Sequence, residues 1–124
     1  MRVARHLIFP AVLILVFSLL ITKSACGHAF PDHAEPRVGA TLTISPGLVR
    51  IWFDSDLEPL FSTLTVRDAS GRTVDRKDSR VDPSDATLLE VSLPRLTPGV
   101  YRVLWSVVAR DGHRTSGDYT FTVK

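Results

Sequence analysis

Cysteine and methionine are almost absent from this chain of 124 residues, which has one of each, Cys26 and Met1. A disulfide needs two cysteines, so the fold has to be held by a packed hydrophobic core. Basic residues are not in strong excess either, with 15 Lys and Arg against 13 Asp and Glu. That balance excludes the strongly basic surface of a nucleic-acid-binding protein. The length is that of one domain.

The first residues have the composition of a secretory signal peptide. Basic residues come first, a mostly apolar run covers residues 7–21, and the small residues Ala25 and Gly27 stand at −3 and −1 of a cleavage site. A membrane-spanning helix needs about 20 apolar residues, so this run is too short. We therefore predict a signal peptide over 1–27, a mature domain over 28–124, and a periplasmic or extracellular location.

A lipid anchor is the alternative to cleavage after Gly27. Ser24, Ala25 and Cys26 are arranged as they are around the lipidated cysteine of a bacterial lipoprotein, although Lys23 stands where such sites usually carry an aliphatic residue. The choice has a chemical consequence. Cleavage after Gly27 makes His28 the first residue, whereas lipidation of Cys26 leaves His28 internal.

The mature segment consists of short β-rich runs separated by turn signals, with no helical periodicity. Apolar and polar side chains alternate within the runs, which favours antiparallel sheets packed over one core. We predict an all-β, Greek-key, immunoglobulin-like β-sandwich of about seven strands, with irregular segments at 54–60 and 77–85. The predicted strands are 41–45, 48–53, 62–67, 72–76, 88–93, 100–109 and 118–123.

Two separate segments together offer a metal-ligand set. An N-terminal His28 would present its α-amine and its imidazole, whose reference pKa values of about 7.7–8.0 and 6.5 let a tightly bound metal displace their protons near neutral pH. Asp111 and His113 stand two residues apart, so an extended backbone directs both to one side, and Gly112 lets the chain bend between them. Three nitrogens and one oxygen suit tetragonal Cu(II).

Simpler interpretations exist for these and the remaining candidates. An isolated Asp-Gly-His is usually a turn. We interpret His33 as a surface residue or a supporting neighbour of the site, because ligation would require the N-terminal arm to fold back on itself. Trp52 and Trp105 lie on alternating strands, which favours core or half-buried positions. No Gly-x-Ser-x-Gly elbow supports a hydrolase.

The segment from His28 to Pro36 resembles the mature N-terminus of the CopC family of periplasmic copper-binding proteins. The run from Pro98 to His113 is similar to the most recognisable segment of that family, and the run from Gly117 to Val123 to its closing strand. The resemblance implies a seven-stranded Greek-key sandwich that holds one Cu(II). The ligands would be the amine and ring of His28, with Asp111 and His113 completing the site.

This chain departs from the family in two ways. Some members bind Cu(I) through a methionine-rich loop, but residues 28–124 contain no methionine, which excludes a thioether site. Some members also place a glutamate near the copper after the second strand. Ser55 stands at that position here, between Asp54 and Asp56, and whether any of the three approaches the copper is left open.

These observations predict an exported Cu(II) carrier, buffer or resistance and uptake factor, monomeric and not an enzyme. It would exchange copper with a separate multi-spanning membrane transporter or with another cuproprotein. Two alternatives stay open. One is an oxidative enzyme of the copper-monooxygenase type, although Asp111 would fill a position that such enzymes leave for oxygen. The other is a copper-free structural sandwich.

Overall fold

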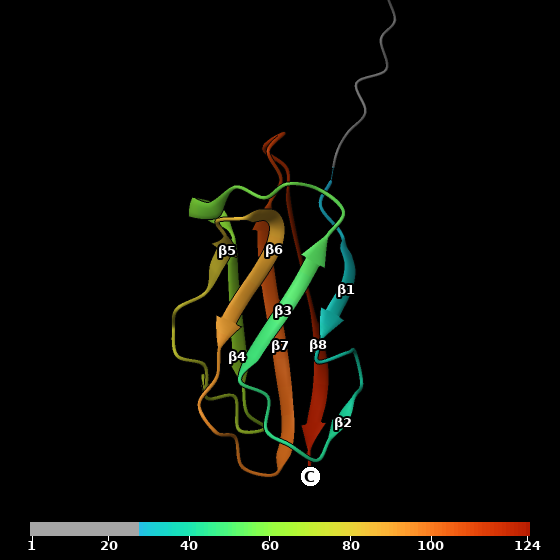
Figure 1. Cartoon of the computed structure of the whole chain (residues 1–124), viewed down its shortest axis with the longest axis vertical. Coiled ribbons are helices and arrows are strands. Elements are labelled where there is room, and N and C mark those ends of the chain that lie inside the picture. Colours follow the sequence, from blue (N-terminus) through green and yellow to red (C-terminus); the bar gives the residue numbers. More distant parts are fainter. Residues whose placement is uncertain (1–27) are drawn as a thin grey trace, which may run out of the picture.

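Two four-stranded β-sheets pack face to face in the computed structural model, which describes residues 28–124 (Figure 1). The strand order is β1-β3-β6-β5 in one sheet and β2-β8-β7-β4 in the other. The strands are β1 (Pro31–Glu35), β2 (Thr41–Leu42), β3 (Leu48–Phe53), β4 (Thr63–Arg67), β5 (Arg80–Asp82), β6 (Asp85–Ser92), β7 (Gly99–Val108) and β8 (Arg114–Val123). A 3-10 turn, η1 (Pro59–Phe61), lies between β3 and β4. The predicted all-β sandwich is confirmed.

The signal peptide predicted over 1–27 lies outside the described residues. Within 28–124 the chain forms no helix with the length and apolar character that crossing a bilayer requires.

The apolar faces that alternation predicts form the core between the sheets. In β3, Val49, Ile51 and Phe53 are buried, whereas Arg50 and Trp52 point outward and are half-buried. Each fully buried side chain of this kind contributes about 1.5–3 kcal/mol by leaving water. The other strands supply matching residues, chiefly Leu64, Val66, Leu89, Val91, Tyr101, Val103, Val107, Tyr119, Phe121 and Val123.

The chain crosses between the sheets after β1, β2, β3, β4 and β6, as the predicted Greek-key arrangement requires. Strands β7 and β8 instead form one long antiparallel hairpin, paired from Gly99 opposite Val123 to Val108 opposite Arg114. Its turn lies at the end of the sandwich where β1 begins, and the C-terminus lies at the other end (Figure 1). The hairpin thereby brings residues 109–113 to the end where the described chain starts.

Two strands of the sandwich were not predicted. β1 pairs antiparallel with β3 at the edge of its sheet, and most of its side chains are exposed, so it carries no apolar alternation. β5 lies inside the segment 77–85, which we had predicted to be a loop, and it has only three residues, with Val81 alone buried. Both strands form by pairing at a sheet edge, with β3 and β6, and the local sequence of neither shows the apolar alternation that would predict a strand.

The strand predicted at 72–76 is wrong. Thr73 forms a single bridge with Arg67, and the rest of the segment is irregular. The carboxylate of Asp75 accepts the backbone N–H groups of Val66 and of Lys77, both at 2.8 Å. A side chain thus takes the donor at Val66 that a strand ladder would otherwise pair.

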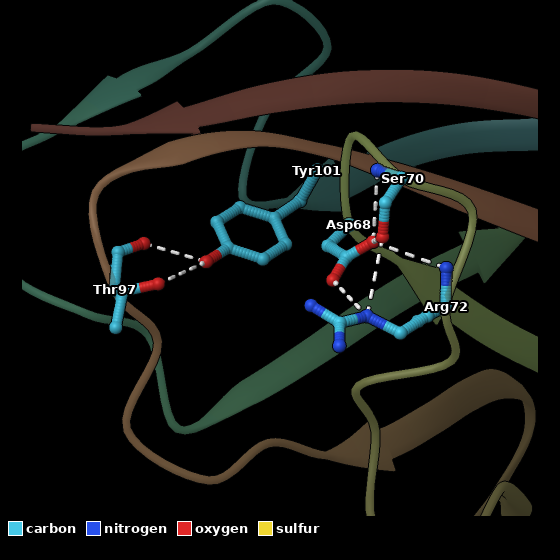
Figure 2. A network of polar contacts seen from close by, with 5 residues as sticks. All are labelled: Asp68, Ser70, Arg72, Thr97 and Tyr101. Atoms are coloured by element: carbon cyan, nitrogen blue, oxygen red, sulfur yellow. Dashed lines mark hydrogen bonds and ion pairs between the residues drawn. The ribbon is translucent and has the colours of Figure 1, made fainter.

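Residues 68–71 form a turn between β4 and the following irregular segment, and its hydrogen bonds explain it (Figure 2). Oδ1 of Asp68 accepts the Ser70 hydroxyl at 2.6 Å and the backbone N–H groups of Ser70 and Arg72 at 2.9 and 3.0 Å. These bonds, the one from the Ser70 hydroxyl first, lower the pKa of the Asp68 carboxyl. Gly71 has a φ of +86°, a left-handed conformation that glycine adopts without steric cost.

Candidate metal centre

The turn between β7 and β8 carries two of the three predicted ligands. The Ala109 N–H donates to the His113 carbonyl at 3.0 Å, and the Gly112 N–H donates to the Ala109 carbonyl at 2.9 Å. Gly112 has a φ of +91°, which explains the glycine between Asp111 and His113. Local chain geometry alone therefore holds Asp111 and His113 together.

Asp111 is turned toward His113 through both carboxylate oxygens. Oδ1 accepts the His113 backbone N–H at 3.0 Å, and Oδ2 lies 3.1 Å from His113 Nδ1. The backbone bond first, then the side-chain bond and the charges of His113 and His28, lower the pKa of the Asp111 carboxyl. With its proton on Nδ1, the ring of His113 donates to Asp111 and keeps Nε2 free for a metal, an orientation common among metal-binding histidines.

His28 reaches the same place from the other end of the described chain. The centroid of its ring lies 4.8 Å from that of His113, and the two planes are inclined by 31°. Both residues are exposed to solvent. The structure therefore brings together His28, Asp111 and His113, although more than 80 positions separate the first from the other two.

Side chains alone do not complete a metal site here. Across residues 28–124, no three His, Cys, Asp or Glu side chains are grouped as a ready-made metal-binding cluster. The donors that do meet are two imidazole rings, with a carboxylate that is already engaged by one of them.

The residues after His28 are firmly held, which the sequence did not indicate. The side chain of Ala29 is fully buried, and its carbonyl accepts the Thr115 hydroxyl at 2.6 Å. The Phe30 N–H donates to Asp54 Oδ1 at 2.8 Å, and the Asp54 N–H donates to the Phe30 carbonyl at 2.9 Å. No local pattern marks contacts between residues so far apart in the sequence.

The acidic residues on either side of Ser55 have other partners. Asp54 receives the Phe30 N–H and, at 3.4 Å, the Ser55 hydroxyl. Asp56 forms an ion pair with Arg110, Oδ2 to Nη1 at 3.1 Å. Both carboxylates thus support the two chain segments that carry the candidate ligands, the N-terminal arm and the hairpin turn.

The predicted surface position of His33 is confirmed. Its ring stacks on Trp52, with centroids 4.4 Å apart and planes inclined by 9°, and Nδ1 lies 3.0 Å from Asp32 Oδ2. Trp52 and Trp105 are half-buried as predicted. Trp105 packs against Phe53 in a T-shaped arrangement and covers Gly117, so its role is packing.

Comparison with known proteins identifies the family. Residues 32–124 match the CopC domain, well over half of the chain. This chain belongs to the CopC family. Asp111 and His113 lie inside the matched segment, whereas His28 precedes it by four positions. The family expectation drawn from the sequence is therefore confirmed for the sandwich.

Three similar proteins show how far the likeness extends. Protein YobA of Escherichia coli K12 is 33% identical over 113 residues, covering 90% of this chain and 91% of YobA. The crystal structure of CopC from Methylosinus trichosporium OB3b has a TM-score of 0.70 and 30% identity, over 78% of this chain and 94% of that one. PcoC from E. coli, described as a methionine-rich copper resistance protein, has a TM-score of 0.67 and 27% identity, over 79% of this chain and 100% of PcoC.

Proposed function

We propose that this CopC-family protein is an exported copper-binding protein that carries or buffers one Cu(II) ion per chain. The observation that carries the proposal is the meeting of the His28 and His113 rings, 4.8 Å apart, beside the Asp111 carboxylate. The related PcoC is described as a copper resistance protein, and the shared fold supports a role in copper handling for this chain.

The donor set explains the choice of oxidation state. Removal of residues 1–27 would free the α-amine of His28, and that amine with the His28 ring would form a chelate. The His113 ring adds a third nitrogen. Asp111 either adds an oxygen ligand or, through its contact with His113 Nδ1, holds the His113 ring in place. Planar nitrogen and oxygen donors favour Cu(II) over other divalent first-row ions. Residues 28–124 contain neither thiolate nor thioether, the donors that Cu(I) prefers.

This role places the protein in the periplasm or outside the cell, where an oxidising environment maintains Cu(II). The candidate ligands are exposed at one end of the sandwich, so copper can enter and leave without unfolding. Such exposure suits a carrier that exchanges its cargo with a membrane transporter or another cuproprotein. We assign it a binding role and no catalytic step.

The free amine provides the decisive test. Protein that begins at His28 should bind one equivalent of Cu(II) in a competition titration with a chelator of known affinity. A form with one added glycine before His28 keeps every side chain, but it turns the His28 nitrogen into a peptide nitrogen and moves the terminal amine onto the glycine. We expect its affinity to fall by more than about 100-fold, because even the supporting partners of metal ligands are worth 10–100-fold. Equal affinities would contradict the proposal.

A further inference from the structure

Three hydrogen bonds hold the two residues that follow His28. The Ala29 carbonyl accepts the Thr115 hydroxyl at 2.6 Å, and Phe30 exchanges two bonds with Asp54, at 2.8 Å to the carboxylate and 2.9 Å from the backbone N–H. The Ala29 side chain is fully buried among the core residues between these contacts. Chain ends usually fray unless something ties them down, and here the chain is fixed one residue away from the candidate ligand.

The two partners belong to different sheets. Asp54 directly follows β3, the neighbour of β1, whereas Thr115 lies in β8. Thr115 stands only two residues beyond His113 and pairs with Val107 in the long hairpin. Its bond to Ala29 therefore connects the chain segment that carries one imidazole directly to the segment that carries the other.

We propose that Thr115 and Asp54 are positioning residues for copper, which hold His28 against His113 before the metal arrives. The inference rests on the proposed function. A ligand whose backbone is already ordered loses less conformational freedom on binding, and this raises affinity without any new contact to the metal. Asp54 acts here as an acceptor for the Phe30 N–H, and neither residue binds copper itself.

Paired substitutions separate positioning from other roles. Thr115→Val keeps the shape of the side chain but removes the hydroxyl, whereas Thr115→Ser retains it. Asp54→Ala removes the acceptor for the Phe30 N–H, whereas Asp54→Asn retains an acceptor oxygen without the charge. Each loss of a bond should weaken Cu(II) binding by roughly 2- to 10-fold, the range of one hydrogen bond. The serine and asparagine variants should bind within about twofold of the unaltered protein.

The asparagine variant also tests whether Asp54 is a copper ligand. A carboxylate ligand would be lost in Asp54→Asn as completely as in Asp54→Ala. Equal weakening in both variants would therefore overturn the positioning role. So would wild-type affinity in both Thr115→Val and Asp54→Ala.

The form with an added N-terminal glycine distinguishes positioning from general damage to the fold. In that form the amine is no longer a ligand, so Thr115→Val should cost clearly less affinity than it costs in the form that begins at His28. Such non-additivity is expected only when the two changes act on the same interaction. An identical loss in both forms would mean that Thr115 does not position the terminal amine.

Failure of this inference differs from failure of the proposed function. If the protein beginning at His28 bound no Cu(II), the proposed function would fall and the inference with it. If that protein bound one equivalent and all four variants matched it, only the positioning role would fall. Thermal unfolding of the apo variants completes the comparison, since a melting temperature that falls in step with affinity would assign Thr115 to the fold instead.

Discussion

Single side chains at one end of the sandwich determine what the domain can bind. His28 and His113 offer ring nitrogens, and Asp111 faces His113 through both of its carboxylate oxygens. His33 resembles them in chemistry only, because its ring is stacked on Trp52 and its Nδ1 is near Asp32. The difference between these histidines lies in their neighbours.

Substitution of these residues should therefore have graded effects on Cu(II) affinity. His113→Ala removes a nitrogen donor and should weaken Cu(II) binding by more than about 100-fold. Asp111→Ala removes the carboxylate and should weaken it by about 10–100-fold. His33→Ala should change affinity by less than about twofold, since no ligand is lost. Competition titrations of the three variants measure this order.

Asp111→Asn serves as the control for the turn, because its amide oxygen can still accept the His113 N–H. If His33→Ala weakened binding as much as His113→Ala, the ligand assignment would be wrong.

At the scale of elements, the β7–β8 hairpin presents the site and is itself held by close packing. Gly117 in β8 lies opposite Trp105 in β7, and the indole covers the space where a side chain would stand. The same indole forms a T-shaped pair with Phe53, with ring centroids 5.3 Å apart and planes inclined by 74°. Because Gly117 has no side chain, Trp105 can lie over it and contact Phe53 of the opposite sheet.

Gly117→Ala should destabilise the fold. The added methyl group would come within 2.5 Å of Trp105 Cζ2, so the indole has to shift, which disturbs its packing. Overpacking of this kind costs about 1–3 kcal/mol. Denaturant unfolding followed by tryptophan fluorescence measures it.

Gly47→Ala is the matched control, because a Cβ there meets nothing within 4 Å and the φ is not left-handed. We expect its stability to stay within about 0.5 kcal/mol of the unaltered protein. A Gly117→Ala variant as stable as Gly47→Ala would show that the indole relocates without loss.

For the whole molecule, the core and the candidate site lie in different places. The buried residues fill the space between the sheets, whereas the three candidate ligands are exposed at one end. We therefore expect the fold to form without a metal, unlike that of a small zinc finger. Bound copper should add stability only by mass action, about 2.7 kcal/mol when free copper exceeds the dissociation constant 100-fold.

Reduction should release the copper and leave the sandwich folded. Residues 28–124 have no cysteine or methionine, so Cu(I) finds no soft donor after Cu(II) is reduced. Ascorbate together with a Cu(I) chelator should abolish the EPR signal and transfer the metal to the chelator, while the circular dichroism of the β domain stays unchanged. Copper retained after complete reduction would reveal a Cu(I) site, and loss of the β spectrum would show that the fold depends on the metal.

Much of the architecture follows from the sequence alone. Val49, Ile51 and Phe53 alternate with Arg50 and Trp52, and the structure buries all three. Successive side chains of a strand point to opposite faces, so this alternation places the three apolar residues on the face that packs against the other sheet. At Asp111, Gly112 and His113 the simpler interpretation, a turn, is the one observed, and the backbone is not extended there, since Gly112 takes a left-handed conformation between two strands. The lack of cysteine and methionine after residue 27 limits the donors to nitrogen and oxygen whatever the fold.

The tertiary structure alone decided how those parts meet. β1 and β5 are edge strands with few buried side chains, so only pairing with β3 and β6 defines them. The bond from Thr115 to Ala29 joins residues 86 positions apart, and a lone threonine in a strand carries no local sign of such a partner. Burial of Ala29 has the same origin. Contacts of this range depend on how two sheets pack, and that information is distributed over the whole core.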